Sequence, residues 1–162
     1  MPVIDLKHAV IKLRDGDSNE LEIKIGDGSC TYSEKKNREY KLNRGLLDNV
    51  RDGDEAPVEV SFNFDWEWLK SSGAEDVTIE EALKKTGGAA AWVTSGTDPC
   101  EPYCVDILIE NEAQCADGAT LDELIELKEF RYESLDHDAK GGTVSVSGKC
   151  NVTEATITRT AL

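Results

Sequence analysis

Five cysteines and two histidines are the residues of this sequence with the widest chemical repertoire, and three of the cysteines crowd into one stretch. That stretch, DPCEPYCVDILIENEAQC, covers residues 98–115. Its thiols could bind zinc, exchange disulfides, staple the chain or fill the core as small apolar groups. The candidates for disulfide formation are Cys30, Cys100, Cys104, Cys115 and Cys150.

The spacing of the cysteines bears on these alternatives. Cys100 and Cys104 have the separation of a loose zinc pair, but the remaining cysteines are scattered and form no second pair. A thioredoxin-like site needs C-x-x-C, one residue shorter than the spacing found here. Buried free thiols and disulfides both stay open. Because five is odd, at least one cysteine is free or pairs with another molecule.

Nucleophilic and metal-assisted catalysis have little support. His8 and His137 stand in no Ser/His/Asp or Cys/His signature. The turn DGDSNE resembles the start of a calcium loop, but Glu20 occupies the position where glycine is required. We therefore expect a protein that is not an enzyme and uses no cofactor and no metal, with this turn solvated.

The charge balance bears on the choice of partner. There are 33 acidic and 18 basic residues, for a net charge of -15. Such a surface repels nucleic-acid phosphates and anionic membranes, so a DNA-reading or lipid-binding function is not expected. It suits solubility, or a surface that lies beside DNA without adhering to it.

The start of the chain, MPVIDLKHAV, lacks the apolar region of a secretory signal. No stretch approaches the roughly 18 apolar residues of a membrane-spanning helix. We expect the protein to be made and initially kept in the cytosol, where its thiols begin reduced.

The elements that position these residues are mostly strands. Period-two alternation predicts a hairpin and two further short strands, at 9–14, 20–25, 30–33 and 38–42. The clearest strand covers 57–69, and its apolar face is expected to pack in the core or between sheets. The residues on that face are Val58, Val60, Phe62, Phe64, Trp66 and Trp68.

One helix is indicated beyond residue 77. Thr78 and Glu81 form a capping box, and Gly87 is expected to end the helix. The segment 121–130 has helical spacing, but its continuation alternates, which favours a strand beginning near Leu127. Two more strands close the chain. The whole predicts a single mainly β domain over residues 1–162, a two-sheet barrel or sandwich with one short flanking α-helix.

A long connection, NRGLLDNVRDGDEAP, separates two of the predicted strands. We expect residues 43–57 to form a long polar loop, and loops of this length are usually functional or unordered. Just before it lies the one basic island, SEKKNREYKLNR. It is either a solvated strand edge or a docking patch for an acidic neighbour, and an acidic copy of the same chain would serve.

The order of several tracts follows a known pattern. The tract from Tyr40 to Phe64 leads into an aromatic strand, then a TIEEALKKTG helix and a final SGKCNVTEATITRT strand pair. In this order and spacing the chain resembles the tail tube proteins of tailed bacteriophages. The resemblance implies a two-sheet β-barrel with a flanking helix, related to the haemolysin-coregulated protein of type VI secretion. Copies would form hexameric rings with a continuous inner barrel, stacked into a tube.

The resemblance implies a structural virion protein, located in the tail and assembled in the host cytoplasm. DNA would pass through the tube during ejection without specific binding, and sheath, baseplate or terminator proteins would be neighbours. The loop 43–57 and an N-terminal arm 1–8 would contact other subunits, and the cysteines would cross-link or staple the tube after lysis. Candidate contact residues between subunits are Arg44, Asp48, Arg51, Asp54, Lys35 and Lys36.

Two other functions compete with this interpretation. A tube protein of a contractile injection or secretion system would share the fold and also form rings. A small cysteine-based zinc or thiol domain would instead act as a monomer, with bound metal or a thiol-dependent fold.

Overall fold

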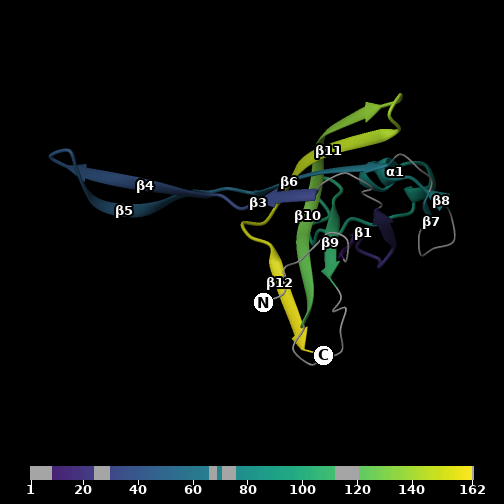
Figure 1. Ribbon diagram of the computed structural model, residues 1–162, viewed down its shortest axis with the longest axis horizontal. Coiled ribbons are helices and arrows are strands. Elements are labelled where there is room, and N and C mark those ends of the chain that lie inside the picture. Colours follow the sequence, from purple (N-terminus) through teal and green to yellow (C-terminus); the bar gives the residue numbers. More distant parts are fainter. Residues whose placement is uncertain (1–8, 24–29, 66–68, 71–75, 112–120, 162) are drawn as a thin grey trace.

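An eight-stranded antiparallel sheet forms the body of the protein (Figure 1). The computed structural model describes residues 9–23, 30–65, 69–70, 76–111 and 121–161. The sheet runs in the order β2-β1-β9-β10-β11-β6-β3, and β12 also pairs with β10. Its strands are β1 (Ala9–Arg14), β2 (Glu20–Ile23), β3 (Cys30–Ser33), β6 (Val58–Asp65), β9 (Val105–Asn111), β10 (Leu121–Asp138), β11 (Thr143–Cys150) and β12 (Thr156–Ala161). The mainly β prediction with one short helix is confirmed.

Strand β6 supplies much of the core. Val58, Val60, Phe62 and Phe64 are all buried, while the residues between them are exposed or half-buried. The Phe62 ring lies 5.9 Å from that of Phe64 and 6.1 Å from that of Phe130, between centroids. The predicted apolar face is confirmed for these residues. Trp66 and Trp68 lie outside the described residues.

One row of isoleucines crosses five strands of the sheet. In register from β2 to β12, its members are Ile23, Ile11, Ile109, Ile125 and Ile157. The first four are buried with the side chains of β6 in the same cluster, so the sheet curves around a common core. The row ends on β12, where Ile157 is 46% exposed.

Helix α1 (Ile79–Lys84) packs three buried side chains against this core. The Thr78 hydroxyl accepts a hydrogen bond from the backbone N–H of Glu81, at 3.3 Å, which confirms the predicted N-cap. The helix ends before Gly87, because Lys85 adopts a left-handed conformation with φ of 57°. The 3-10 helix η2 (Gly87–Ala89) follows. None of the helices in the described residues combines the length and apolar character needed to cross a bilayer.

Strand β10 differs from its prediction. It is continuous from Leu121 to Asp138, so neither a helix over 121–130 nor a start near Leu127 is correct. Ile125 pairs with Ile109 of β9 on one edge and Ile157 of β12 on the other. Two-sided ladder pairing therefore overrides the helical spacing of this segment.

The turn between β1 and β2 is held by a buried carboxylate. Asp15 is 3% exposed and accepts from the backbone N–H groups of Asp17, Asn19 and Val93 and from the Asn19 side-chain amide, at 2.7–3.0 Å. The expectation of a solvated turn is wrong at this residue. The carboxylate ties the turn to the loop that follows η2 (Gly87–Ala89).

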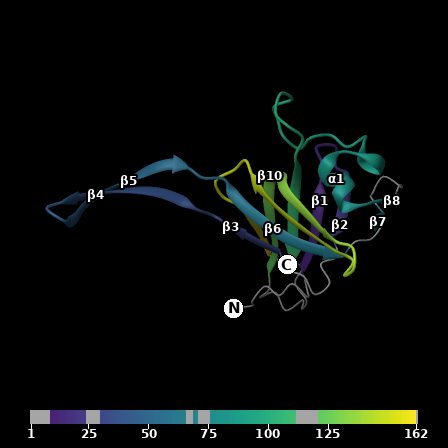
Figure 2. The same ribbon diagram turned by 90° about the horizontal axis from the view of Figure 1, so that it is seen from above.

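A second sheet is a long hairpin that projects from the body (Figures 1 and 2). It consists of β4 (Lys36–Asn43) and β5 (Leu46–Glu55), so the expectation of a polar loop over 43–57 is wrong. Arg44 and Gly45 form the turn with φ of 54° and 81°, the conformation that two-residue hairpin turns require. A further short pair, β7 (Leu69–Lys70) and β8 (Asp76–Val77), lies beside the body.

Candidate assembly interface

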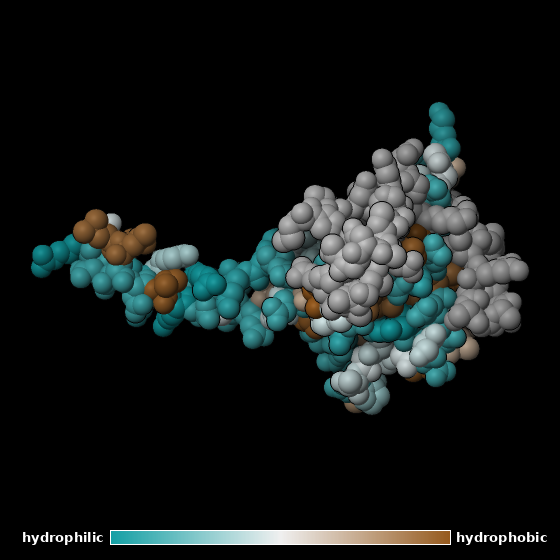
Figure 3. Space-filling model, turned by 60° about the horizontal axis from the view of Figure 1, so that its bottom comes forward, coloured by the Kyte–Doolittle hydropathy of each residue, from teal (hydrophilic) through white to brown (hydrophobic). Residues whose placement is uncertain are grey.

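The hairpin carries large apolar side chains in full view of solvent. Tyr40 and Leu42 of β4 are each 63% exposed, and Leu46, Leu47 and Val50 of β5 are 73%, 75% and 48% exposed. Figure 3 shows apolar patches along the outer part of the hairpin, away from the body. Apolar side chains gathered on a protruding element are typical of an interaction surface.

The strand register places four of these side chains on one face. Tyr40 lies opposite Val50, and Leu42 lies opposite Leu47. Because directly opposed residues share a face, and alternate residues of a strand do too, these four form what we call the apolar face. A register shift between Lys41 and Leu42 accommodates the extra residue Asp48. Leu46 lies opposite Asn43 at the tip.

The opposite face of the hairpin is charged. There Arg51 Nε donates to the Glu39 carboxylate, and Lys41 lies opposite Asn49. On the same side as the apolar face but nearer the body, Arg38 Nη1 donates to Asp52 Oδ1 at 3.2 Å. The outer part of the hairpin therefore has one apolar face and one polar face, although both strands are almost entirely exposed.

The root of the hairpin is fastened to the body at several points. Lys35 Nζ lies 2.9 Å from Glu59 Oε2 on β6, and this lysine lowers the pKa of the Glu59 carboxyl by hydrogen bonding and by its charge. Glu34 Oε1 accepts from the backbone N–H of Ala155 at 2.9 Å. These contacts fasten the base of the two-stranded hairpin to the sheet.

The predicted contact residues fall into two groups. Arg51, Lys36 and Lys35 form ion pairs within the chain, with Glu39, Asp52 and Glu59. Within the described residues, Arg44, Asp48 and Asp54 form no ion pair of this kind. Arg44 sits at the turn and Asp48 at the register shift. Charges near the tip are therefore open to a neighbour.

The apolar face was missed by the sequence analysis. Its signal was present, since Tyr40 and Leu42 alternate before Arg44-Gly45, and apolar residues resume directly after it. Because charged residues surround these apolar ones, the segment was predicted to be a polar loop. The extra residue at Asp48 also breaks the alternation of β5.

The four described cysteines are all free. Cys100 is exposed, Cys30 is half-buried, and Cys104 and Cys150 are buried. Burial raises the pKa of the Cys30 thiol to about 11 and that of Cys150 to about 12. Because all four are free, no disulfide joins any two of them. Cys115 lies outside the described residues. Cross-linking between copies stays a prediction.

The described residues offer little for catalysis or metal binding. No group of three His, Cys, Asp or Glu side chains within them could hold an ion. His137 Nε2 lies 2.9 Å from Glu80 Oε2, which joins β10 to α1, and His8 lies outside the described residues.

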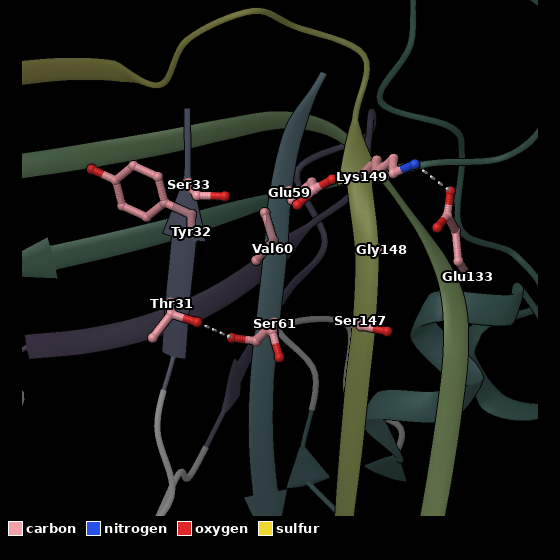
Figure 4. A pocket seen from close by; sticks show the side chains of 10 residues that line it. All are labelled: Thr31, Tyr32, Ser33, Glu59, Val60, Ser61, Glu133, Ser147, Gly148 and Lys149. Carbon is pink, nitrogen blue, oxygen red and sulfur yellow. Dashed lines mark hydrogen bonds and ion pairs between the residues drawn. The ribbon is translucent and has the colours of Figure 1, made fainter. Parts of the chain in front are cut away.

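A shallow groove crosses the outer face of β3, β6 and β11 (Figure 4). Small hydroxyl side chains line it, and the Thr31 hydroxyl donates to the carbonyl of Ser61 at 3.4 Å. One side of the groove is formed by Lys149 and Glu133, whose Nζ and Oε1 atoms lie 3.8 Å apart. Unlike the hairpin, this face presents small polar groups.

The architecture is that of a curved antiparallel sheet with one flanking helix and a projecting hairpin. It is similar to a chain in the cryo-EM structure of the anti-feeding prophage (AFP) baseplate, 6-fold symmetrised. The match has a TM-score of 0.50 at 8% sequence identity and covers 98% of this chain and 96% of that chain. At this identity the likeness is one of fold. No family model matches the sequence, and no curated protein matches it significantly.

Proposed function

We propose that the protein is a structural subunit of a phage-tail-like contractile injection particle, in which its copies associate through the hairpin. The apolar face formed by Tyr40, Leu42, Leu47 and Val50 is the observation that carries this proposal. Its function is assembly, and no catalytic residue is assigned.

The energetics favour a hairpin that ends up buried. A two-stranded hairpin is marginally stable in water by itself, and a long exposed apolar ribbon invites aggregation. Burying one large aliphatic side chain contributes about 1.5–3 kcal/mol. Three such side chains and a tyrosine on one face give a partner a substantial driving force. In a chain of net charge -15, unpaired basic groups at the hairpin tip would help orient an acidic partner, such as a second copy.

The likeness of fold bears on the kind of particle. The similar chain belongs to a six-fold symmetrised baseplate structure of an anti-feeding prophage. This supports the injection-system alternative better than the tail tube of an infecting phage. In our proposal the copies form hexameric rings, which stack or adjoin other proteins of the particle, and the rings surround a passage for its cargo.

Negative-stain electron microscopy across a concentration series tests this proposal. We expect rings or short tubes to appear as concentration rises, without any added cofactor. Single globules at every concentration, confirmed as monomers by sedimentation, would contradict self-assembly. Elemental analysis of the same sample addresses the competing thiol or zinc domain, because one equivalent of bound zinc per monomer would favour that function instead.

A further inference from the structure

Strand β12 presents an edge that lacks the usual protection against strand addition. Within the described residues, no strand pairs with the side of β12 that faces away from β10. Its first residues, Thr156, Ile157 and Thr158, are all β-branched and carry no charge, and a charged residue follows only at Arg159. The other end of the isoleucine row differs, since β2 bears Glu20 and Glu22. Edges that avoid pairing usually carry charges, proline or bulges, so β12 is built to receive a strand.

On the inner face of this edge, one apolar side chain is left partly exposed. The isoleucine row is buried through Ile125 and then ends at Ile157, which stays 46% exposed. One more strand beside β12 would cover Ile157 and continue the row.

An acidic cavity lies at the N-terminal end of β12. It has a volume of about 630 Å³ and lies between the hairpin root and the start of β12. Its walls include Glu55, Glu154 and Thr156. In the described part of the chain, neither of these glutamates forms an ion pair within 4 Å. A basic group arriving at this end would therefore find unpaired carboxylates.

Strand β4 has the properties that such an edge requires. Only β5 pairs with it in the described residues, so one of its edges is open. Tyr40 and Leu42 alternate on its apolar face, and the basic residues Lys41 and Arg44 lie near its end. The hairpin tip lies far from β12 of its own chain in both views (Figures 1 and 2). The donor must therefore belong to a second copy.

We infer that β4 of a second copy adds antiparallel to the open edge of β12. Leu42 of the second copy then lies beside Ile157, and its paired Leu47 continues the row one strand further. In this register Arg44 of the second copy approaches the carboxylates of Glu55 and Glu154, whereas Lys41 lies further along β12, opposite Thr158. This inference rests on the proposed assembly through the hairpin and specifies its acceptor and mode, which is strand addition.

Photo-crosslinking from position 157 tests the acceptor. Ile157 is replaced by benzoylphenylalanine, isotopically light and heavy copies are mixed and assembled, and cross-linked peptides are identified by mass spectrometry. We expect light–heavy cross-links to peptides within residues 36–55. Cross-links to β2, or to any segment other than the hairpin, would overturn the inference while leaving self-assembly intact. A sample that stays monomeric at every concentration would overturn the proposed function as well.

Paired substitutions on β12 provide a second test. Ile157→Asp places a charge at the end of the isoleucine row, whereas Thr158→Asp places it on the opposite face of the same strand. We expect the first to raise the concentration needed for assembly at least tenfold, about what losing burial of one isoleucine predicts, and the second to change it less than threefold. Circular dichroism checks that both variants fold. Equal effects of the two substitutions would overturn the inference.

Discussion

The body and the hairpin use the same element in opposite ways. In β6 of the body, buried and exposed residues alternate, and every inward side chain joins one core. In the hairpin, β4 is exposed along its whole length and β5 nearly so, although Leu42 and Leu47 are as apolar as residues in the core. The comparison shows that β6 completes its packing within one chain and the hairpin does not.

The forces that hold each region differ accordingly. The body relies on burial of aliphatic and aromatic side chains, which is the dominant favourable term in folding. The hairpin relies on its two-residue turn, its ladder and exposed ion pairs such as Arg38 with Asp52. Exposed ion pairs contribute at most about 1 kcal/mol each. The hairpin is therefore the region whose stability should depend most on a neighbour.

Replacing the apolar face should have the largest effect. Changing Tyr40, Leu42, Leu47 and Val50 together to Thr keeps β-propensity but removes most of the apolar surface. We expect the concentration needed for assembly to rise more than about a hundredfold, since losing only two large burials already amounts to that factor. The melting temperature of the body should change little. Sedimentation and thermal unfolding measure the two quantities.

A matched variant on the charged face controls for this result. Glu39→Thr with Arg51→Thr removes an exposed ion pair from the other side of the same hairpin. Assembly should shift less than about threefold, because such pairs are worth little. Comparable losses in the two variants would mean that the face does not matter, and the comparison with the body would lose its basis.

Phe62→Ala should be the strongest single change to the body. Its ring is 2% exposed and packs near those of Phe64 and Phe130. We expect the free energy of unfolding to fall by about 3–5 kcal/mol in urea denaturation. Ser61→Ala, on the outer face, should change it by less than about 0.5 kcal/mol. A small effect of Phe62→Ala would show that β6 does not anchor the core.

Asp15→Ala should have an intermediate effect. The carboxylate accepts four hydrogen bonds, and its loss leaves several of their donors without a partner. We expect a loss of about 3 kcal/mol of unfolding free energy, against less than about 0.5 kcal/mol for the exposed Asp17→Ala. Equal losses would indicate that the turn is solvated after all.

Thiol reactivity should give the smallest change, and it sharpens the contrast between buried and exposed groups. Raised pKa values of about 11 for Cys30 and about 12 for Cys150 keep both thiols protonated at pH 8.5. In a Cys115→Ser background, iodoacetamide should modify exposed Cys100 about a hundredfold faster than these two, because the thiolate is the nucleophile. Raising the pH through 11 should narrow the difference in modification rate between Cys100 and the two other cysteines. Equal rates at pH 8.5 in folded protein would contradict the burial.

The body was largely accessible from sequence, and so was β4, which contains the predicted strand at 38–42, but the rest of the hairpin was not. Period-two alternation identified the β1–β2 hairpin and the face of β6, and the capping residue Thr78 located α1. These signals are local and point inward, toward a core that the same chain supplies. The start of β10 was predicted wrongly because its pairing on both edges involves residues from other parts of the sequence.

The apolar face of the hairpin was not predicted, for a different reason. Leu47 and Val50 lie among charges and around a register shift, so β5 shows no clean alternation. Burial by a partner is not encoded as a core pattern within one chain. The charged residues chosen as contacts, such as Arg51 and Lys36, instead stabilise the hairpin itself through pairing with Glu39 and Asp52.

Hydrogen exchange of the hairpin in dilute and assembled protein tests the central claim most directly. We predict that amides of residues 36–55 exchange at least about tenfold more slowly after assembly, because a partner covers them, while those of β6 and β11 stay unchanged. Hairpin amides that exchange equally fast in assembled and monomeric protein would contradict the account, since the apolar face would then remain in water.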